Sequence, residues 1–388
     1  MKISDRIRYV GVDDRCTVLF EGLWPLPMGV SYNSYLVVGQ KVALIDTVEA
    51  DFSAELLSNI RAEIGDRRVD YIVVNHMEPD HSSGITALRE AYPEVEIVGN
   101  AKTVQMLNGY YGIEGCCSAV VDGATLDLGG ATLSFHLTPM VHWPETMMTL
   151  LAEEQTLFSG DAFGTFGALG GKVLDAETDT APYWDEMYRY YSNIVGKYGI
   201  PVQKAMQKLS STEVKTICPT HGPVWRGELQ KVLRIYDSLS RYEGERGVVI
   251  AYGSMYGNNR AAAEYLSARL ADGGMKPVKL YDLTLADPSF VIADAFRYNT
   301  LITGSPTYNG EIFPPVENLL RALSSRGLRD RRFGCFGSFT WAGAAVKKMR
   351  EAAESAGWTI LEPSPEFKQG FNQNPKEQFD ALAAKICE

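Results

Sequence analysis

The stretch YIVVNHMEPDH, residues 71–81, decides how the first half of this 388-residue chain is interpreted. Its first four residues form a short apolar run that predicts a buried strand. Directly after that run, four potential metal ligands lie within six residues: His76, Glu78, Asp80 and His81. With five histidines in the chain, the pattern H-x-E-x-D-H would arise by chance on the order of 10⁻⁴ times, so it indicates a metal site.

The spacing inside this motif suggests that its ligands are shared between two metal ions. In an extended segment, alternate side chains point the same way. His76 and Glu78 can therefore bind one ion, while Asp80 and His81 turn toward a second.

Three further candidate ligands stand shortly after apolar runs that predict strands: His142, Asp161 and His221. Loops at strand ends hold functional groups on a rigid scaffold. Each residue alone is equally explained as an ordinary loop residue or a hydrogen-bonded core histidine. Together with the motif, the three indicate one site. His136 is different because it lies inside an apolar run, between Phe135 and Leu137, and we expect it to be structural.

The rest of the first half reads as many short strands with helices at both ends. This pattern favours two sheets packed together and covered by helices. Strands are predicted at 34–38, 42–46, 71–74, 96–99, 118–121, 125–128, 131–137, 147–152, 156–159 and 216–218, and helices at 51–64, within 182–209 and at 228–241.

The chain divides near residue 245, where the polar segment SRYEGERG (residues 240–247) precedes a new apolar run. We therefore predict domains at 1–245 and 246–388. In the second domain strands and helices alternate, which is typical of a doubly wound, five-stranded parallel sheet. Strands are predicted at 248–252, 277–281, 300–304, 332–336 and 359–361, and helices at 260–271, 289–296, 315–324, 343–356 and 376–386.

The loop GSMYGNN, residues 253–259, lies between the first strand and the first helix of the second domain. Its hydroxyl, amide and backbone N–H groups at a helix N-terminus make an anion site. The chain contains neither G-x-G-x-x-G nor G-x-x-x-x-G-K-[ST], so a dinucleotide or a nucleoside triphosphate is disfavoured. The loop fits the phosphate of FMN, although turn chemistry alone gives a similar composition.

Two later loops, GSPTYNG (304–310) and GSFTWAG (337–343), follow the third and fourth strands. Ligands of such folds bind outside the carboxyl ends of the strands. Tyr308 and Trp341 can pack against an isoalloxazine ring, or alternatively cover helix ends. The predicted FMN-binding residues are Ser254, Met255, Tyr256, Gly257, Asn258, Asn259, Ser305, Pro306, Thr307, Tyr308, Asn309, Gly310, Ser338, Phe339, Thr340, Trp341 and Gly343.

Composition narrows the function classes. A net charge of −11 argues against a nucleic-acid partner, because phosphate binding needs basic clusters. The sequence contains no run of 18 apolar residues, so we predict no membrane span. The charged N-terminus does not resemble a secretory signal. The six cysteines show no C-x-x-C spacing, so no rubredoxin-type iron site is predicted. We expect a cytoplasmic protein with reduced thiols.

The order of the seven candidate ligands resembles that of the metallo-β-lactamase superfamily: an H-x-[HE]-x-D-H loop, then His, Asp and His. The resemblance implies an αββα sandwich for the first domain and a bridging role for Asp161. Zinc hydrolases of this superfamily usually carry His where this chain has Glu78. A carboxylate there shifts preference toward iron or manganese and suits a non-haem di-iron centre.

The loops of the second domain resemble those of flavodoxins, with Asn259 in place of the expected last hydroxyl of the phosphate loop. Asparagine can still donate to phosphate. A lactamase-like domain fused to a flavodoxin-like domain resembles the flavodiiron proteins over nearly the whole chain. The family carries two iron ions and FMN, and reduces dioxygen to water, nitric oxide to nitrous oxide, or both. The resemblance places His76, Glu78, His142 and Asp161 at one iron, and Asp80, His81, Asp161 and His221 at the other.

Two other functions remain open at this point: a metal-dependent hydrolase with an accessory FMN domain, and a flavin electron carrier with a vestigial metal site. The flavodiiron resemblance also implies an external electron donor, such as rubredoxin, a reduced flavoprotein or a deazaflavin. It further implies a homodimer or a dimer of dimers in which the FMN of one chain faces the metal site of the other.

Overall fold

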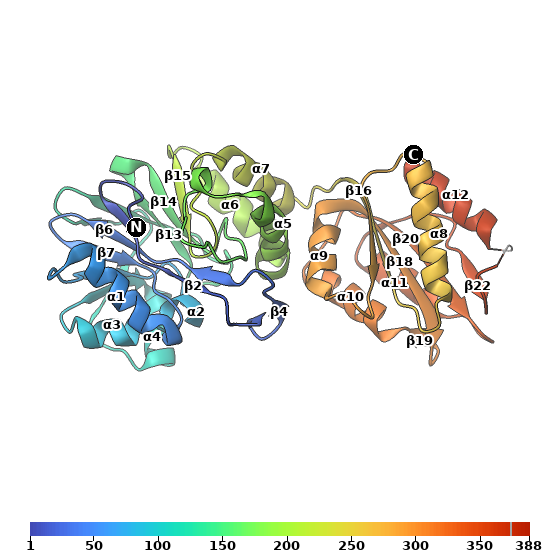
Figure 1. Ribbon diagram of the computed structural model, residues 1–388, viewed down its shortest axis with the longest axis horizontal. Coiled ribbons are helices and arrows are strands. Elements are labelled where there is room, and N and C mark those ends of the chain that lie inside the picture. Colours follow the sequence, from blue (N-terminus) through green and yellow to red (C-terminus); the bar gives the residue numbers. More distant parts are fainter. Residues whose placement is uncertain (373–374) are drawn as a thin grey trace. The chain divides into compact units, whose positions relative to one another are not determined.

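The computed structural model describes residues 1–372 and 375–388. It divides into two compact units (Figure 1). The first comprises Met1–Tyr190 and Ile200–Asp237, and the second comprises Tyr191–Gly199 and Ser238–Glu388. The domain ranges expected from the sequence, 1–245 and 246–388, stay a prediction.

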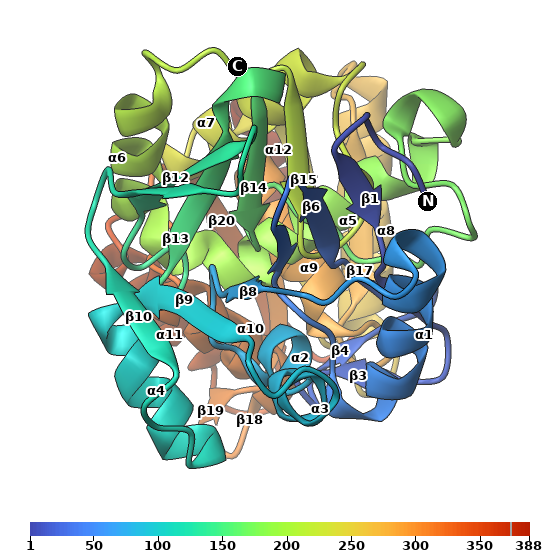
Figure 2. The ribbon, with the colours of Figure 1, turned by 90° about the vertical axis from the view of Figure 1, so that its left-hand side faces the viewer.

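Two packed sheets with helices outside them form the first unit (Figure 2). The first sheet has, in spatial order, β1 (Ile7–Tyr9), β6 (Tyr35–Val38), β7 (Val42–Ile45), β8 (Tyr71–Val73), β9 (Glu96–Asn100) and β10 (Cys117–Val120). The second has β11 (Thr125–Asp127), β12 (Thr132–Leu137), β13 (Met147–Leu151), β14 (Thr156–Gly160) and β15 (Thr216–Pro219). This arrangement confirms the predicted αββα sandwich.

Helices cover both outer sides of the sandwich. In Figure 2, α1, α3 and α4 lie on one side, and α6 and α7 lie on the other. The helices are α1 (Ser53–Ile64), α2 (Pro79–Ser82), α3 (Ile85–Ala91), α4 (Ala101–Tyr111), α5 (Ala181–Tyr190), α6 (Gly199–Leu209) and α7 (Leu229–Ser240). Short turns of tighter helix in the first unit are η1 (Ala50–Phe52), η2 (Ala152–Glu154) and η3 (Asp175–Glu177), whereas η4 (Tyr191–Val195) and η5 (Gly196–Tyr198) lie in the segment that belongs to the second unit.

Local sequence explains where these elements begin and end. α1 buries Leu56, Ile60 and Ile64 on one face, which is the helical spacing of an amphipathic segment. The Asn100 side chain accepts hydrogen bonds from the backbone of Lys102 and Thr103 and so caps α4. Two short ribbons were not expected from the sequence: β2 (Val12–Asp14) with β5 (Val30–Tyr32), and β3 (Leu19–Phe20) with β4 (Trp24–Pro25).

The strand directions bring several loops to one edge of the sandwich. β7, β8 and β9 run parallel to one another in the first sheet, and β14 runs parallel to β15 in the second. The carboxyl ends of β8, β14 and β15 lead directly into the loops that carry most of the candidate metal ligands.

The second unit is a doubly wound sheet in the order β17-β16-β18-β20-β21, with all pairs along this path parallel. Its strands are β16 (Glu245–Tyr252), β17 (Val278–Asp282), β18 (Tyr298–Tyr308), β20 (Arg332–Phe339) and β21 (Thr359–Ile360). Its helices are α8 (Asn258–Asp272), α9 (Pro288–Arg297), α10 (Pro314–Ser325), α11 (Ala345–Ser355) and α12 (Lys376–Cys387). This order confirms the flavodoxin-like expectation.

Two small strands extend the predicted five. β19 (Glu311–Ile312) pairs antiparallel with β18, and β22 (Glu366–Lys368) pairs parallel with β20. The single last strand expected at 359–361 is therefore followed by a second segment that pairs with the same neighbour. Pro363 and Pro365 separate the two segments, because proline has no N–H group for a ladder hydrogen bond.

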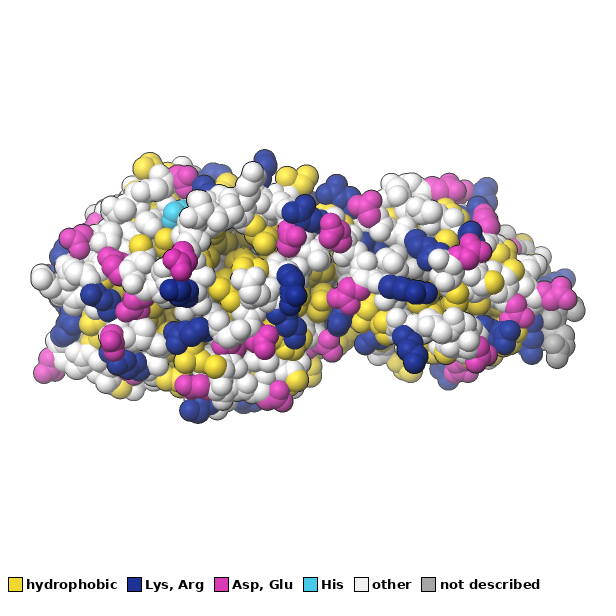
Figure 3. Space-filling view, turned by 90° about the horizontal axis from the view of Figure 1, so that it is seen from above, with side chains coloured by type: hydrophobic (Ala, Val, Ile, Leu, Met, Phe, Trp, Pro, Cys, Tyr) yellow, Lys and Arg dark blue, Asp and Glu magenta, His cyan; other side chains and the backbone are white. Residues whose placement is uncertain are grey.

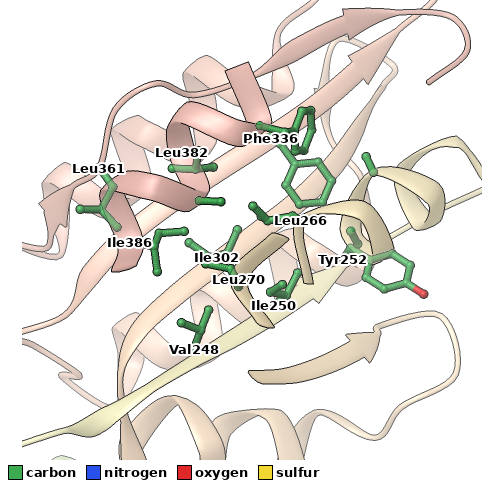
Figure 4. Close-up of a cluster of buried hydrophobic side chains, with 14 of the residues drawn as sticks. Val248, Ile250, Tyr252, Leu266, Leu270, Ile302, Phe336, Leu361, Leu382 and Ile386 are labelled. Atoms are coloured by element: carbon green, nitrogen blue, oxygen red, sulfur yellow. The ribbon is translucent and has the colours of Figure 1, made fainter. Parts of the chain in front are cut away.

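The core of the second unit lies between its sheet and one helical layer (Figure 4). Val248 and Ile250 of β16 meet Leu266 of α8 and Leu382 of α12 there, and each is fully buried. Burial of each such side chain contributes about 1.5–3 kcal/mol. α8 and α12 share this face, whereas α9 and α10 lie on the other side of the sheet (Figure 1).

Among the helices of the described residues, none combines the length and the apolarity that a membrane crossing requires.

Candidate functional site

The loops after β8, β12, β14 and β15 bring the seven candidate metal ligands together in the first unit. His76 and Glu78 follow β8 in extended backbone, and Pro79 then starts the short helix α2, which carries Asp80 and His81. The side chains of Asp80 and His81 point away from those of His76 and Glu78 because the backbone changes there from extended to helical. The alternation of side chains along an extended strand is not the cause. The gathered residues are His76, Glu78, Asp80, His81, His142, Asp161 and His221.

The first group surrounds one oxygen of Asp161. His142 Nε2 lies 3.0 Å from Asp161 Oδ2 and 3.1 Å from Glu78 Oε2. His76 Nε2 lies 3.6 Å from the same Asp161 oxygen and 3.3 Å from the same Glu78 oxygen. Two imidazole nitrogens and two carboxylate oxygens therefore face a common point.

The second group surrounds the other oxygen of Asp161. His81 Nε2 lies 3.1 Å from Asp161 Oδ1, and His221 Nε2 lies 3.8 Å from it. Asp80 is on the same side, with Oδ2 3.2 Å from His221 Nε2 and Oδ1 3.6 Å from His81 Nε2. Asp161 thus directs one oxygen at each group, which is the arrangement that a carboxylate bridging two cations requires.

Unsatisfied polar atoms show that the second group fits a cation. Both carboxylate oxygens of Asp80 and the Nε2 atoms of His81 and His221 are buried, and among the described residues their close contacts lack the geometry of hydrogen bonds. Such atoms are costly to bury unless they are paired. A metal ion at this point would pair with all of them at once.

A second candidate site lies at the carboxyl edge of the sheet in the second unit. A cavity of about 270 Å³ opens there between the loops that follow β16, β18 and β20. Ten of the predicted FMN-binding residues line it: Ser254, Met255, Tyr256, Asn258, Asn259, Pro306, Thr307, Ser338, Phe339 and Thr340.

The first of these loops is built to present backbone amides. Ser254 Oγ accepts hydrogen bonds from the backbone N–H of Gly257 at 3.1 Å and of Arg260 at 3.3 Å. Gly257 has a φ of +86°, in the left-handed region that favours glycine, and α8 begins at the next residue. The N-terminus of α8 therefore points at the cavity as an anion site.

Seven other predicted residues do not line the cavity: Gly257, Ser305, Tyr308, Asn309, Gly310, Trp341 and Gly343. Ser305 is fully buried, and its hydroxyl accepts a hydrogen bond from the backbone of Phe313. Trp341 and Tyr256, in contrast, are 88% and 89% exposed, which is unusual for large aromatic side chains. A flat aromatic ligand would cover such side chains, so the loops fit FMN. The cavity also includes Gln369 and Gly370, which lie beyond β22 and were not expected.

Each of the two units matches a known protein family. Residues 30–222 match the family described as ODP family beta lactamase, and residues 250–382 match flavodoxin. The chain is 32% identical to a nitric oxide reductase of Moorella thermoacetica, covering 94% of this chain and 92% of that protein. It is 31% identical to the anaerobic nitric oxide reductase flavorubredoxin of Escherichia coli K12, covering 99% of this chain and 80% of the other.

Among solved structures, the rubredoxin oxygen:oxidoreductase of the anaerobe Desulfovibrio gigas superposes with a TM-score of 0.94 at 30% identity, covering 100% of this chain and 97% of that one. The chain belongs to the flavodiiron protein family. This membership places it among the oxidoreductases. The flavodoxin domain implies FMN, and the flavodiiron family implies iron at the cluster of histidines and carboxylates.

Two hydrogen bonds hold metal-site imidazoles of this flavodiiron protein in place from behind. His76 Nδ1 lies 2.6 Å from Glu145 Oε1, and His221 Nδ1 lies 2.8 Å from the carbonyl oxygen of Ser31. Both leave Nε2 as the free nitrogen, because the hydrogen-bonded nitrogen carries the proton. Glu145 was missed from the sequence, and the only signal for it was its place three residues after His142.

The charges of the site perturb its titration. Burial alone lowers the pKa of an imidazole, but the Asp161 carboxylate raises the pKa of His76 and of His142 to about 10. Burial would raise the pKa of Asp161, but the imidazoles of His81 and His76 hold it well below its usual range. The site is thus strongly anionic when the imidazoles are neutral, and a bound metal must displace their protons.

Two further residues adjoin the site of this flavodiiron protein without having been predicted. The Tyr190 ring packs 5.6 Å from that of His221, and its buried hydroxyl has no hydrogen-bond partner among the described residues. Glu21, between β3 and β4, receives a hydrogen bond from Trp24. Desolvation of its carboxyl group and the neighbouring Glu78 carboxylate raise the pKa of Glu21 to about 7. Neither residue stands in a motif, so only the fold reveals them.

His136 lies outside the site, as expected. It is part of β12, and its Nε2 lies 3.2 Å from Ser134 Oγ.

Proposed function

We propose that this flavodiiron protein reduces nitric oxide to nitrous oxide, dioxygen to water, or both, at two iron ions that receive electrons from FMN. The observation that carries the proposal is the position of Asp161, whose two oxygens each face a separate group of imidazole and carboxylate ligands. A carboxylate shared in this way supports two metal ions close enough to act on one small molecule.

The ligands divide between the two irons as the contacts suggest. His76, Glu78 and His142 bind one ion, Asp80, His81 and His221 bind the other, and Asp161 bridges them. The Glu145 carboxylate accepts a hydrogen bond from the Nδ1–H group of His76 and so fixes the orientation of that imidazole. Three carboxylates among seven ligands favour iron over zinc.

The cavity of the second unit would hold FMN. The N-terminus of α8 would bind its phosphate, and the exposed side chains of Tyr308 and Trp341, which do not line the cavity itself, would pack against its ring. When bound, FMN takes up electrons in pairs and releases them singly to iron.

The reaction balances with electrons and protons alone. Two molecules of nitric oxide take up two electrons and two protons and give nitrous oxide and water. Dioxygen takes up four electrons and four protons and gives two molecules of water. The Tyr190 hydroxyl is a hydrogen-bond donor beside the second group of ligands.

We further propose that the enzyme acts in the cytoplasm as a homodimer or dimer of dimers. It takes electrons from an external donor, such as rubredoxin, a reduced flavoprotein or a deazaflavin. The names of the Desulfovibrio and Escherichia relatives, which both include rubredoxin, support the first of these donors.

The decisive experiment measures consumption of each gas by full-length protein with quantified iron and FMN, under anaerobic conditions apart from the gas supplied. A panel of reduced donors is tested, and nitrous oxide is measured directly. His142→Ala should abolish turnover. The matched variant His136→Ala, which changes a histidine of the same unit outside the site, should retain it. A protein that binds zinc, hydrolyses a substrate and consumes neither gas would instead support a hydrolase with an accessory FMN domain.

A further inference from the structure

An apolar cavity of about 430 Å³ lies in the first unit, between the second sheet and helices α6 and α7. We call it the α6–α7 cavity. Figure 3 looks onto the side of the molecule that carries these helices and shows a hollow lined by hydrophobic side chains there. The metal ligands named above are not among the residues that line it.

The cavity becomes more apolar with depth. At its mouth are Ser210, Glu213 and Gln230, which are exposed. Its inner wall includes Val141 and Ala162, which are almost fully buried. The inner wall offers water few hydrogen-bond partners, and apolar cavities take up xenon.

Two residues of the inner wall are direct sequence neighbours of candidate metal ligands. Val141 directly precedes His142, and Ala162 directly follows Asp161. Both ligands belong to the first group around Asp161 Oδ2. The inner end of the cavity is therefore lined by the residues next in sequence to two candidate ligands of one metal position.

We propose that the α6–α7 cavity binds the diatomic gas substrate and concentrates it beside the metal site. This inference rests on the proposed function. Nitric oxide and dioxygen are small, uncharged and weakly hydrated, so they partition from water into an apolar space as xenon does. An unfilled cavity costs stability in proportion to its volume, and a larger side chain at Ala205 would remove that cost. Binding of gas gives the empty volume a function.

Xenon serves as the probe, because it binds apolar cavities and undergoes no reaction. Full-length protein loaded with iron and FMN is titrated with xenon and followed by ¹²⁹Xe NMR. Ala205→Trp fills the cavity from α6, and Ala205→Leu fills it partly. Gln207→Trp places the same ring on the exposed side of the same helix as a control.

We expect xenon binding in the unchanged protein and in Gln207→Trp, weaker binding in Ala205→Leu and none in Ala205→Trp. The KM for the gas should rise about threefold or more in Ala205→Trp while kcat at saturating gas stays the same, because binding and not the chemical step is impaired. Iron and FMN contents should not change.

Absence of xenon binding in the unchanged protein, or an unchanged KM in both Ala205 variants, would overturn the inference. If Ala205→Trp does not fold, the graded effect of Ala205→Leu decides. Xenon binding by a protein that consumes neither gas would refute the proposed function and the role of the cavity in supplying substrate, while leaving its affinity for apolar gas established.

Discussion

Asp161 is the central residue of the proposed metal site, because its two oxygens face different sets of imidazoles. His81 also lies close to both groups, but its imidazole offers only one nitrogen, Nε2, toward Asp161. His76, Glu78, Asp80 and His81 were recognisable in the sequence because four ligand types crowd into six residues after an apolar run. Asp161 itself had only its place at a strand end to mark it. Its position between the groups depends on the packing of two sheets and becomes visible only in the fold.

Removal of this carboxylate should affect both metal positions. We expect Asp161→Ala to lose at least one of two irons per chain, because the bridge contributes a ligand to each. Metal analysis of the purified variant measures the loss. Asp66→Ala, which removes an exposed aspartate of the same unit, is the control and should keep full iron content. Two irons in Asp161→Ala would disprove the bridging role.

Glu145 contacts the candidate metal site through His76 and also accepts a hydrogen bond from the backbone N–H of Met77. Its Oε1 lies 2.6 Å from His76 Nδ1, so Glu145→Gln replaces a charged acceptor with a neutral amide. Iron affinity should fall about 10–100-fold, because partners behind a ligand fix its orientation and basicity. Competition with a chelator measures the affinity, with Glu90→Gln on the exposed side of α3 as control. An unchanged affinity would show that Glu145 is only a structural partner.

At the scale of elements, a strand or a helix was predictable wherever apolar residues recur along the segment with the period of that element alone. The strand–helix alternation of the second unit was therefore recovered from the sequence almost segment by segment. The ribbon of β3 and β4 was missed because two-residue strands carry no pattern. The division of the last strand into β21 and β22 follows from Pro363 and Pro365, a signal that was present in the sequence and was not used.

The turn before α8 depends on the left-handed backbone of Gly257. A Cβ atom at this position would meet no neighbour within 4 Å, so a substitution there acts through the backbone and not through a clash. The left-handed conformation costs a β-branched residue about 1–2 kcal/mol. We expect Gly257→Val to raise the Kd for FMN about 10-fold, and Gly257→Asn to raise it much less, because asparagine tolerates this backbone. Quenching of flavin fluorescence measures both. Equal effects of the two variants would argue against the conformational explanation.

Buried Arg331 joins three segments of the second unit. Its guanidinium donates to the carbonyl oxygens of Ala295 and Phe296 at the end of α9, and to that of Tyr242. Arg331→Met would leave these carbonyls without their partner, and should destabilise the unit by about 1–3 kcal/mol. Urea unfolding followed by FMN release measures the change. Arg321→Met, on an exposed face of α10, should change stability by less than about 0.5 kcal/mol. A similar small effect at Arg331 would contradict the expectation.

At the scale of the whole molecule, the metal ligands belong to one compact unit and the FMN cavity to the other. Electrons must pass between them for turnover. A pair of chains related by two-fold symmetry creates two equivalent contacts at once, so the FMN of each chain can serve the metal site of its partner. The sequence motifs predicted both candidate sites but gave no information on this pairing, because an interface has no local pattern comparable to a ligand motif.

Two inactive full-length variants can distinguish transfer between chains from transfer within one chain. Asp161→Ala impairs the metal site and leaves the FMN cavity intact. Ser338→Trp fills the FMN cavity and leaves the metal ligands intact. Each variant alone should be inactive. After the two are refolded together in equal amounts, half of the dimers contain one chain of each kind, and each such dimer has one working pair of sites. Transfer between chains therefore predicts recovery of about a quarter of the activity of the unchanged protein. Transfer within one chain predicts no recovery, since neither chain holds both sites. A mixture that stays inactive although mass spectrometry shows mixed dimers, or an unchanged protein that is fully active as a monomer in sedimentation at assay concentration, would rule out the dimer as the working unit.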